Sequence, residues 1–159
     1  MSAAGRNPRE IAFVSSLSQE HHQQLESLLF FNRRQDKVRP GILDAITRYG
    51  APEIVGGTTG LKVRVAGPVE SQCLFAVERQ GAASRPVGLI LYTRDSFERI
   101  TVMHLVVAEE FAAGGPLADQ QLLLRLVRAV RRIARSTSGI RHVDLLYAQS
   151  RMRAEAACA

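Results

Sequence analysis

The chain has 159 residues, of which 46% are hydrophobic and 23% charged, a composition that excludes disordered and fibrous classes and fits one globular domain. No apolar run is long enough to span a bilayer, and the two cysteines are too far apart to predict a disulfide framework or a metal site. The formal net charge of +6 is compatible with nucleic acid, acidic lipid or an anionic cofactor, although abundant arginine and alanine often reflect only the base composition of the genome.

The N-terminal part of the chain predicts a strand and two helices. Residues 1–9 carry no periodic pattern and no apolar signal segment, so we expect a flexible N-terminus on a cytoplasmic protein, with residues 10–159 forming a single domain. Ser18 has the residue type of an N-cap, and Pro40 with Gly41 opens an apolar stripe of helical spacing. The expected elements are a strand over 10–16, a helix over 19–31, a helix over 41–50 and a glycine-rich loop over 51–60.

The middle of the chain predicts an antiparallel meander of strands. Short polar gaps separate its apolar runs and suit hairpin connections, and the first run alternates apolar and basic residues as an edge strand does. The last run is apolar on both faces, which predicts a central strand that is covered on both sides. The expected strands are 61–67, 71–81, 85–95 and 97–110.

The segment after this central strand predicts a strand–helix–strand crossover. The loop "AEEFAAGGPLADQ" leads into a helix expected over 119–135 and then into a strand expected over 139–148. Such a crossover makes the two strands parallel neighbours in the sheet. Apolar residues build one face of the helix, and a stripe of arginines occupies another. The arginine stripe consists of Arg125, Arg128, Arg132 and Arg135.

This order of elements resembles the GNAT superfamily of N-acetyltransferases, from about Glu10 to Tyr147. The stretch "HLVVAEEFAAGGPLADQQLLLRLVRAV" is similar to the family's apolar strand, short loop and Q/R-x-x-G-x-G/A motif at the start of a helix. Gly115 takes the first glycine position, whereas Ala112 and Leu117 stand where the family has Gln or Arg and a second small residue. The resemblance implies an α/β (α+β) fold with a mixed, mostly antiparallel sheet and helices on both faces.

The resemblance also implies acetyl-CoA, or another acyl-CoA, as the cosubstrate. In the family, glycines let the loop backbone approach the CoA pyrophosphate at a helix N-terminus, and the preceding strand offers its backbone to the pantetheine arm. An arginine on the helix can add positive potential there, although exposed charges are usually solvated. The residues expected to bind the cofactor are Leu105, Val106, Val107, Gly114, Gly115, Leu117, Ala118 and Arg125.

Acyl transfer to an amine requires a base, and the sequence offers two candidate catalytic residues. Glu109 follows the central strand at the cofactor loop, where simple solvation is the alternative. His104 lies inside that strand and titrates near neutral pH, but a histidine there is more often a hydrogen-bonded core residue. No metal is expected. The predicted activity is acyl-CoA-dependent N-acyl transfer to an amine-bearing small molecule or protein.

Two other functions stay open at this point. The chain after Tyr147 is too short for the closing helix and last strands that the resemblance implies. This favours a homodimer that supplies the missing surface, or a catalytically inactive GNAT-like module that binds a partner or dimerises. The arginine stripe instead suits a small basic protein that binds nucleic acid, although no aromatic residues are interleaved with it. No membrane partner is expected.

Overall fold

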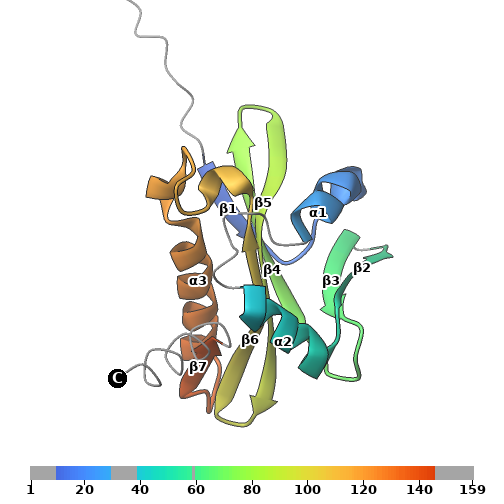
Figure 1. Ribbon diagram of the computed structural model, residues 1–159, viewed down its shortest axis with the longest axis vertical. Coiled ribbons are helices and arrows are strands. Elements are labelled where there is room, and N and C mark those ends of the chain that lie inside the picture. The colour runs from blue at the N-terminus through green and yellow to red at the C-terminus, as the bar shows by residue number, and fades with distance from the viewer. Residues whose placement is uncertain (1–9, 30–38, 59, 146–159) are drawn as a thin grey trace, which may run out of the picture.

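A strand and two helices come first, followed by a run of consecutive strands and then by a helix and a last strand, in the part of the chain that the computed structural model describes, residues 10–29, 39–58 and 60–145 (Figure 1). In chain order the elements are β1 (Glu10–Val14), η1 (Gln19–His21), α1 (His22–Leu29), α2 (Arg39–Tyr49), β2 (Pro52–Gly57), β3 (Gly60–Val65), β4 (Gln72–Gln80), β5 (Ala83–Ser96), β6 (Arg99–Val107), η3 (Glu109–Phe111), η4 (Ala118–Gln120), α3 (Leu122–Ser136) and β7 (His142–Leu145), where η denotes a 3-10 helix. The flexible N-terminus expected over 1–9 lies outside the described residues.

Five strands form the main sheet, in the order β1-β4-β5-β6-β7. Its neighbouring strands are antiparallel except β6 and β7, which run parallel with Arg99 opposite His142 and Val102 opposite Leu145. Parallel neighbours need a crossover connection, and α3 provides it. The expectation of a mixed, mostly antiparallel sheet in an α+β fold is confirmed.

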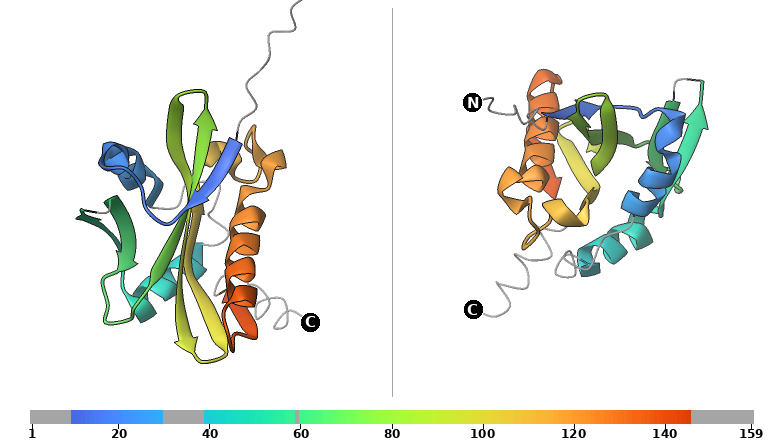
Figure 2. Two further views of the ribbon diagram at one scale, coloured as in Figure 1. Left: turned by 180° about the vertical axis from the view of Figure 1, so that it is seen from behind. Right: turned by 90° about the horizontal axis from the view of Figure 1, so that it is seen from above.

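Helices cover both faces of this sheet (Figure 2). α3 packs on one face, where the side chains of Leu122, Leu126 and Val130 are completely buried. α1 and the β2–β3 hairpin pack on the other face through Leu25 and Leu61. β6 contributes residues to both apolar layers, as its doubly apolar pattern predicts. The sheet therefore separates two hydrophobic layers, and β6 lies between them.

The glycine content of segment 51–60 predicts a loop, and this prediction is wrong. β2 occupies most of the segment and pairs with β3 from Pro52 opposite Val65 to Gly57 opposite Gly60. The run Glu53-Ile54-Val55 supplies strand-forming residues, and the glycines gather where the hairpin turns. Gly60 has a φ of +106°, a backbone conformation that glycine adopts without a steric penalty.

The hairpin forms a sheet of its own and is not part of the meander that the sequence predicts. Backbone hydrogen bonds tie it to the connection between β1 and α1. The Leu17 N–H donates to the Leu61 carbonyl at 3.0 Å, and the Leu61 N–H donates to the Leu17 carbonyl at 2.7 Å. β3 is thus attached to the layer below α1 by a short antiparallel bridge.

The remaining differences concern the ends of elements. β4 and β5 extend toward each other until Gly81 and Ala82 alone connect them, so this hairpin is tighter than predicted. The crossover helix starts at Leu122, because η4 and a left-handed Gln121 (φ 50°) precede it. The expected strand over 139–148 is β7 within the described residues, and its predicted end lies outside them. None of the described helices has the length and apolarity to cross a membrane.

Candidate functional site

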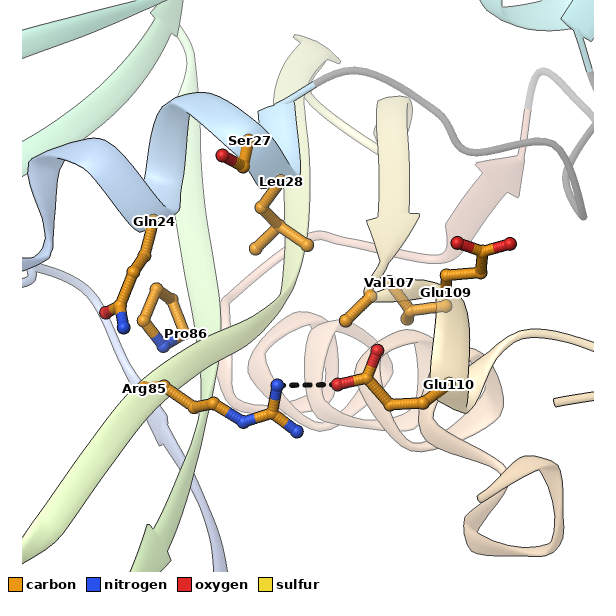
Figure 3. Close-up of a pocket in the computed structure, with 9 residues that line it drawn as sticks. Gln24, Ser27, Leu28, Arg85, Pro86, Val107, Glu109 and Glu110 are labelled. Atoms are coloured by element: carbon orange, nitrogen blue, oxygen red, sulfur yellow. Dashed lines mark ion pairs between the residues drawn. The ribbon is translucent and has the colours of Figure 1, made fainter. Parts of the chain in front are cut away.

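A pocket of about 340 Å³ opens at the end of β6 (Figure 3). One wall is α1, and the other is formed by the start of β5 and the segment that follows β6. Its lining residues are Gln24, Ser27, Leu28, Arg85, Pro86, Val107, Ala108, Glu109 and Glu110. Two carboxylates and one guanidinium give this lining a net negative charge, which favours a cationic group in the pocket.

Arg85 is held between two carboxylates at the edge of the pocket. Its Nη1 lies 2.5 Å from Glu110 Oε1, and its Nε lies 3.2 Å from Glu78 Oε1. Partial burial acts to lower the pKa of Arg85, but the hydrogen bonds and charges of Glu110 and Glu78 outweigh burial and raise it. Arg85 therefore stays charged and joins β4, β5 and η3 in one ion-pair network.

Glu78 is the buried member of this network, with 7% of its surface exposed. One carboxylate oxygen accepts a hydrogen bond from Arg85 Nε, and the other, Oε2, is buried without a hydrogen-bond partner among the described residues. A buried carboxylate depends strongly on its ion-pair partner, because removal of that partner leaves an uncompensated charge. Arg85 therefore neutralises the buried charge of Glu78 and also lines the pocket.

The register of the β4–β5 hairpin brings this pair together. Gln80 pairs with Ala83 across the two-residue turn, so Glu78 lies opposite Arg85. Opposite charges directly across an antiparallel pair stabilise the sheet. The sequence prediction misses the pair because "QGAASRP" suits a longer connection. A two-residue turn that begins at Gly81 predicts the pair, because counting back from it along both strands places Glu78 opposite Arg85. The structure has this turn, in which the φ of Gly81 is +61°.

The glycine-rich loop after β6 bonds its backbone N–H groups internally. The Gly115 N–H donates to the Ala112 carbonyl at 2.9 Å, and the Leu117 N–H donates to the Glu110 carbonyl at 2.8 Å. The Ala118 N–H donates to the Gly115 carbonyl at 3.2 Å. An anion at these positions has to compete with hydrogen bonds that the loop already makes.

The two glycines of this loop shape its turn. A Cβ added at Gly115 falls 2.6 Å from the Glu110 carbonyl oxygen and 2.8 Å from that of Glu109. Gly114 has a φ of +79°, in the left-handed region. Of the residues expected to bind the cofactor, Gly114, Gly115, Leu117 and Ala118 therefore lie together in one closed turn between η3 and α3.

The other residues expected to bind the cofactor lie on β6 and α3. Leu105, Val106 and Val107 are buried on β6, and Val107 lines the pocket. The Arg125 guanidinium lies 5.9 Å from the centre of the Phe13 ring. Phe13 belongs to β1, at the opposite edge of the sheet from β7, so Arg125 lies on the β1 side of α3.

The structure separates the two candidate catalytic residues. Glu109 is exposed and lines the pocket. His104 is buried, and its Nε2 donates a hydrogen bond to the Leu29 carbonyl at 2.8 Å, which links β6 to the end of α1. Burial lowers the pKa of His104, and the bond to Leu29 opposes that effect only in part. Glu110, which with Glu109 follows the central strand at the cofactor loop, also lines the pocket.

The first turn of α3 offers backbone donors close to the glycine-rich loop. Gln121 occupies the N-cap position in a left-handed conformation, and its side chain makes no capping hydrogen bond. The N–H groups of the first helical turn and the positive end of the helix dipole can bind an anion. The described residues hold no group of three or more His, Cys, Asp or Glu side chains placed to bind a metal ion.

A scan against protein-family models, a search of the curated proteins and a search of the solved structures gave no match for this chain.

Proposed function

We propose that the chain is a GNAT-like domain that transfers an acyl group from acyl-CoA to an amine. The observation that carries the proposal is the strand order β1-β4-β5-β6-β7, in which α3 connects the parallel pair β6 and β7. This order agrees with the strand, helices, meander and strand–loop–helix–strand arrangement that the resemblance implies. Because a fold hosts many functions, the pocket has to supply the chemical argument.

The pocket at the end of β6 supports an amine acceptor. Its volume of about 340 Å³ suits a small amine and an acyl group, and its carboxylates attract a protonated amine. Glu109 is the proposed base. It accepts the proton of the ammonium group, and the amine nitrogen then attacks the thioester carbonyl carbon. The C–N bond forms, and the nitrogen, which then carries two hydrogens and a positive charge, gives up its second proton to solvent. The C–S bond breaks, and CoA leaves as a thiolate that takes a proton from solvent.

The donor is proposed to bind along β6 with its pyrophosphate at the first turn of α3. No side chain caps the N–H groups of Leu122, Leu123 and Leu124. The N–H groups of Gly115 and Leu117, by contrast, already donate to carbonyls within the loop. The acyl arm then runs past Val107 into the pocket. This assigns the phosphate contact to the helix end and gives the glycines of the loop a structural role.

Thermal unfolding with acetyl-CoA tests donor binding, and CoA release with a panel of primary amines tests transfer. A ligand at about 100 times its Kd adds about 2.7 kcal/mol of stability, which raises the melting temperature measurably. Glu109→Gln is expected to lower kcat about 100-fold or more while it keeps the shift with acetyl-CoA. Glu53→Gln, which changes a carboxylate on the hairpin, is the matched control. No shift with acetyl-CoA, CoA or longer acyl-CoAs contradicts the proposal.

The closed loop favours a second candidate, a GNAT-like module that binds a partner or dimerises without catalysis. Three backbone N–H groups of the loop already donate to loop carbonyls. An acyl-CoA whose phosphates need these N–H groups therefore cannot bind unless the loop rearranges. This candidate predicts no shift with any acyl-CoA and a dimer in analytical ultracentrifugation. Acyl-CoA binding with turnover contradicts it.

A further inference from the structure

α3 is a strongly basic helix. Its sequence LLLRLVRAVRRIARS holds five arginines and no carboxylate, in a chain with a formal net charge of +6. The apolar face of α3 packs on the sheet, so Arg128, Arg131, Arg132 and Arg135 are exposed. Like charges three and four residues apart destabilise a helix, and this concentration therefore works against the stability of α3.

These four guanidinium groups have no carboxylate partner in the part of the chain that the structure describes. Three arginines on other elements do have such partners. Arg64 pairs with Glu53 at 2.8 Å, Arg99 pairs with Asp144 at 3.0 Å, and Arg85 bridges two carboxylates. The outer face of α3 is thus a surface whose positive charge is not neutralised within the described fold.

A hollow of about 200 Å³ lies between the C-terminal half of α3 and β7. It is lined by Arg131, Ala134, Arg135, Ile140, Arg141 and Val143. Half of these residues are arginines, and none is acidic. Arg141 contacts Glu98 at 4.0 Å, and both side chains are exposed, so this pair is weak. A hollow with three guanidinium groups suits an anionic group that accepts several hydrogen bonds.

The fold brings an aromatic residue to the same end of α3. Phe97, in the turn between β5 and β6, is 72% exposed. Its ring contacts the α3–β7 connection, because a Cβ added at Gly139 falls 2.6 Å from the ring. The Arg94 guanidinium lies 5.1 Å from the ring centre and donates to the Ser138 carbonyl at 3.1 Å. Phe97 is distant from α3 in the sequence but lies beside the connection that follows α3 in the fold.

We propose that this surface binds the phosphate backbone of a single-stranded nucleic acid. We define the arginine face as Arg128, Arg131, Arg132, Arg135 and Arg141. Guanidinium forks bind phosphate in a bidentate manner, and the rise of about 1.5 Å per residue spreads Arg128 to Arg135 over about 10 Å, enough for several phosphates. An unpaired base can stack on the exposed ring of Phe97.

An anionic membrane fits this surface less well. Binding of an amphipathic helix to a lipid surface requires an apolar face that enters the headgroup region. The apolar face of α3 is buried against the sheet, where Leu122, Leu126 and Val130 are completely inaccessible. The arginine face therefore offers charge and hydrogen bonds to a phosphate chain, and the proposal is independent of acyl transfer in the pocket.

Fluorescence anisotropy of labelled 20-nucleotide single strands with the full chain tests the proposal. Three to five neutralised phosphates predict a slope of about −2 to −3.5 for log Kobs against log salt. The variant Arg128→Gln/Arg131→Gln/Arg135→Gln is expected to reduce the magnitude of that slope by about 2 and to weaken binding about 10-fold at low salt. Phe97→Ala is expected to weaken binding to single strands about fivefold and to leave duplex binding unchanged.

The matched control is Arg48→Gln/Arg64→Gln/Arg79→Gln, which removes three charges from other elements. Equal weakening by the control and the α3 variant overturns the proposal, because only net charge then matters. Binding to anionic vesicles without binding to oligonucleotides overturns it in favour of a membrane surface. Circular dichroism checks that each variant is folded, and the single changes Arg131→Gln and Arg135→Gln repeat the comparison if the triple variant is not.

Discussion

The two regions joined at the start of α3 differ in how their polar groups are partnered. After β6, Arg85 lies between Glu78 and Glu110, and the loop donors at Gly115 and Leu117 bond to loop carbonyls. On the outer face of α3, exposed arginines have no carboxylate partner among the described residues. The glycines that suggest a ligand site in the sequence instead shape a loop whose N–H groups bond within it. The arginines that suggest ordinary surface are exposed and have no carboxylate partner in the described part of the chain.

The largest expected effect comes from removal of Arg85, the cation that pairs with Glu78 and Glu110. Arg85→Met leaves Glu78 buried without a counter-charge, and we expect a loss of about 3 kcal/mol in the free energy of unfolding. Arg64→Met breaks the exposed pair with Glu53 and is expected to cost about 1 kcal/mol or less. Urea denaturation measures both. Similar losses for the two variants contradict the claim that Glu78 depends on Arg85.

The second prediction concerns the loop backbone. Gly115→Ala places a Cβ 2.6 Å from the Glu110 carbonyl oxygen, and the backbone has to shift. We expect a loss of about 2 kcal/mol in stability, as for overpacking elsewhere. Gly57→Ala is the control, because a Cβ there meets nothing within 4 Å. A Gly115→Ala variant as stable as the control shows that the loop is not the closed turn described above.

The third prediction tests the buried histidine of β6 by changing pH. Burial lowers the pKa of His104 in the folded state, so the unfolded chain binds its proton at a higher pH than the folded chain does. The stability contributed by this group is therefore complete above about pH 6.5 and falls as the pH drops below that value, by up to about 1.4 kcal/mol per pH unit.

Urea midpoints at about pH 7.5 and about pH 5.5 measure this loss. His104→Gln keeps an amide donor for the Leu29 carbonyl and is expected to flatten the pH dependence. The control His22→Gln changes an exposed histidine and is expected to leave the dependence as it is. An unchanged slope in His104→Gln refutes the assignment.

The smallest effect is expected on the outer face of α3. Arg128→Gln removes an exposed charge without a carboxylate partner among the described residues, so stability is expected to stay within about 0.5 kcal/mol of the parent protein. Relief of like-charge repulsion acts in the stabilising direction. Thermal unfolding at low salt measures the change. A larger loss indicates that Arg128 makes a stabilising contact. Arg128 then resembles Arg85, and the contrast between the two regions fails.

Local patterns in the sequence predict most of the element order. Apolar runs separated by short polar gaps identify β4, β5 and β6, the apolar stripe identifies α3, and the crossover between β6 and β7 follows from their order. Segment 51–60 resists prediction because its glycines suit a turn as well as a strand, and only pairing with β3 decides between the two. α3 also starts later than the predicted residue 119. The Gln121 N–H still donates to the Ala118 carbonyl in the loop, and the Arg125 N–H donates to the Gln121 carbonyl as the first hydrogen bond of the helix.

The candidate site is less predictable, because it depends on contacts between distant segments. Glu109 is found from its place after the central strand, and it does line the pocket. The ion-pair network of Glu78, Arg85 and Glu110 joins three elements and has no local pattern beyond the hairpin register. The hydrogen bond of His104 to Leu29 crosses 75 positions of the sequence, so only the folded chain distinguishes a core histidine from a base.

The backbone bridge between Leu17 and Leu61 has a consequence for motion. The hairpin of β2 and β3 meets the rest of the chain through this bridge and through an apolar layer. Native proteins open in cooperative units whose free energies are lower than that of global unfolding. If the hairpin separates as such a unit, the amide protons of Leu17 and Leu61 exchange with solvent deuterium together, and their shared rate reports how often the layer beneath α1 is uncovered.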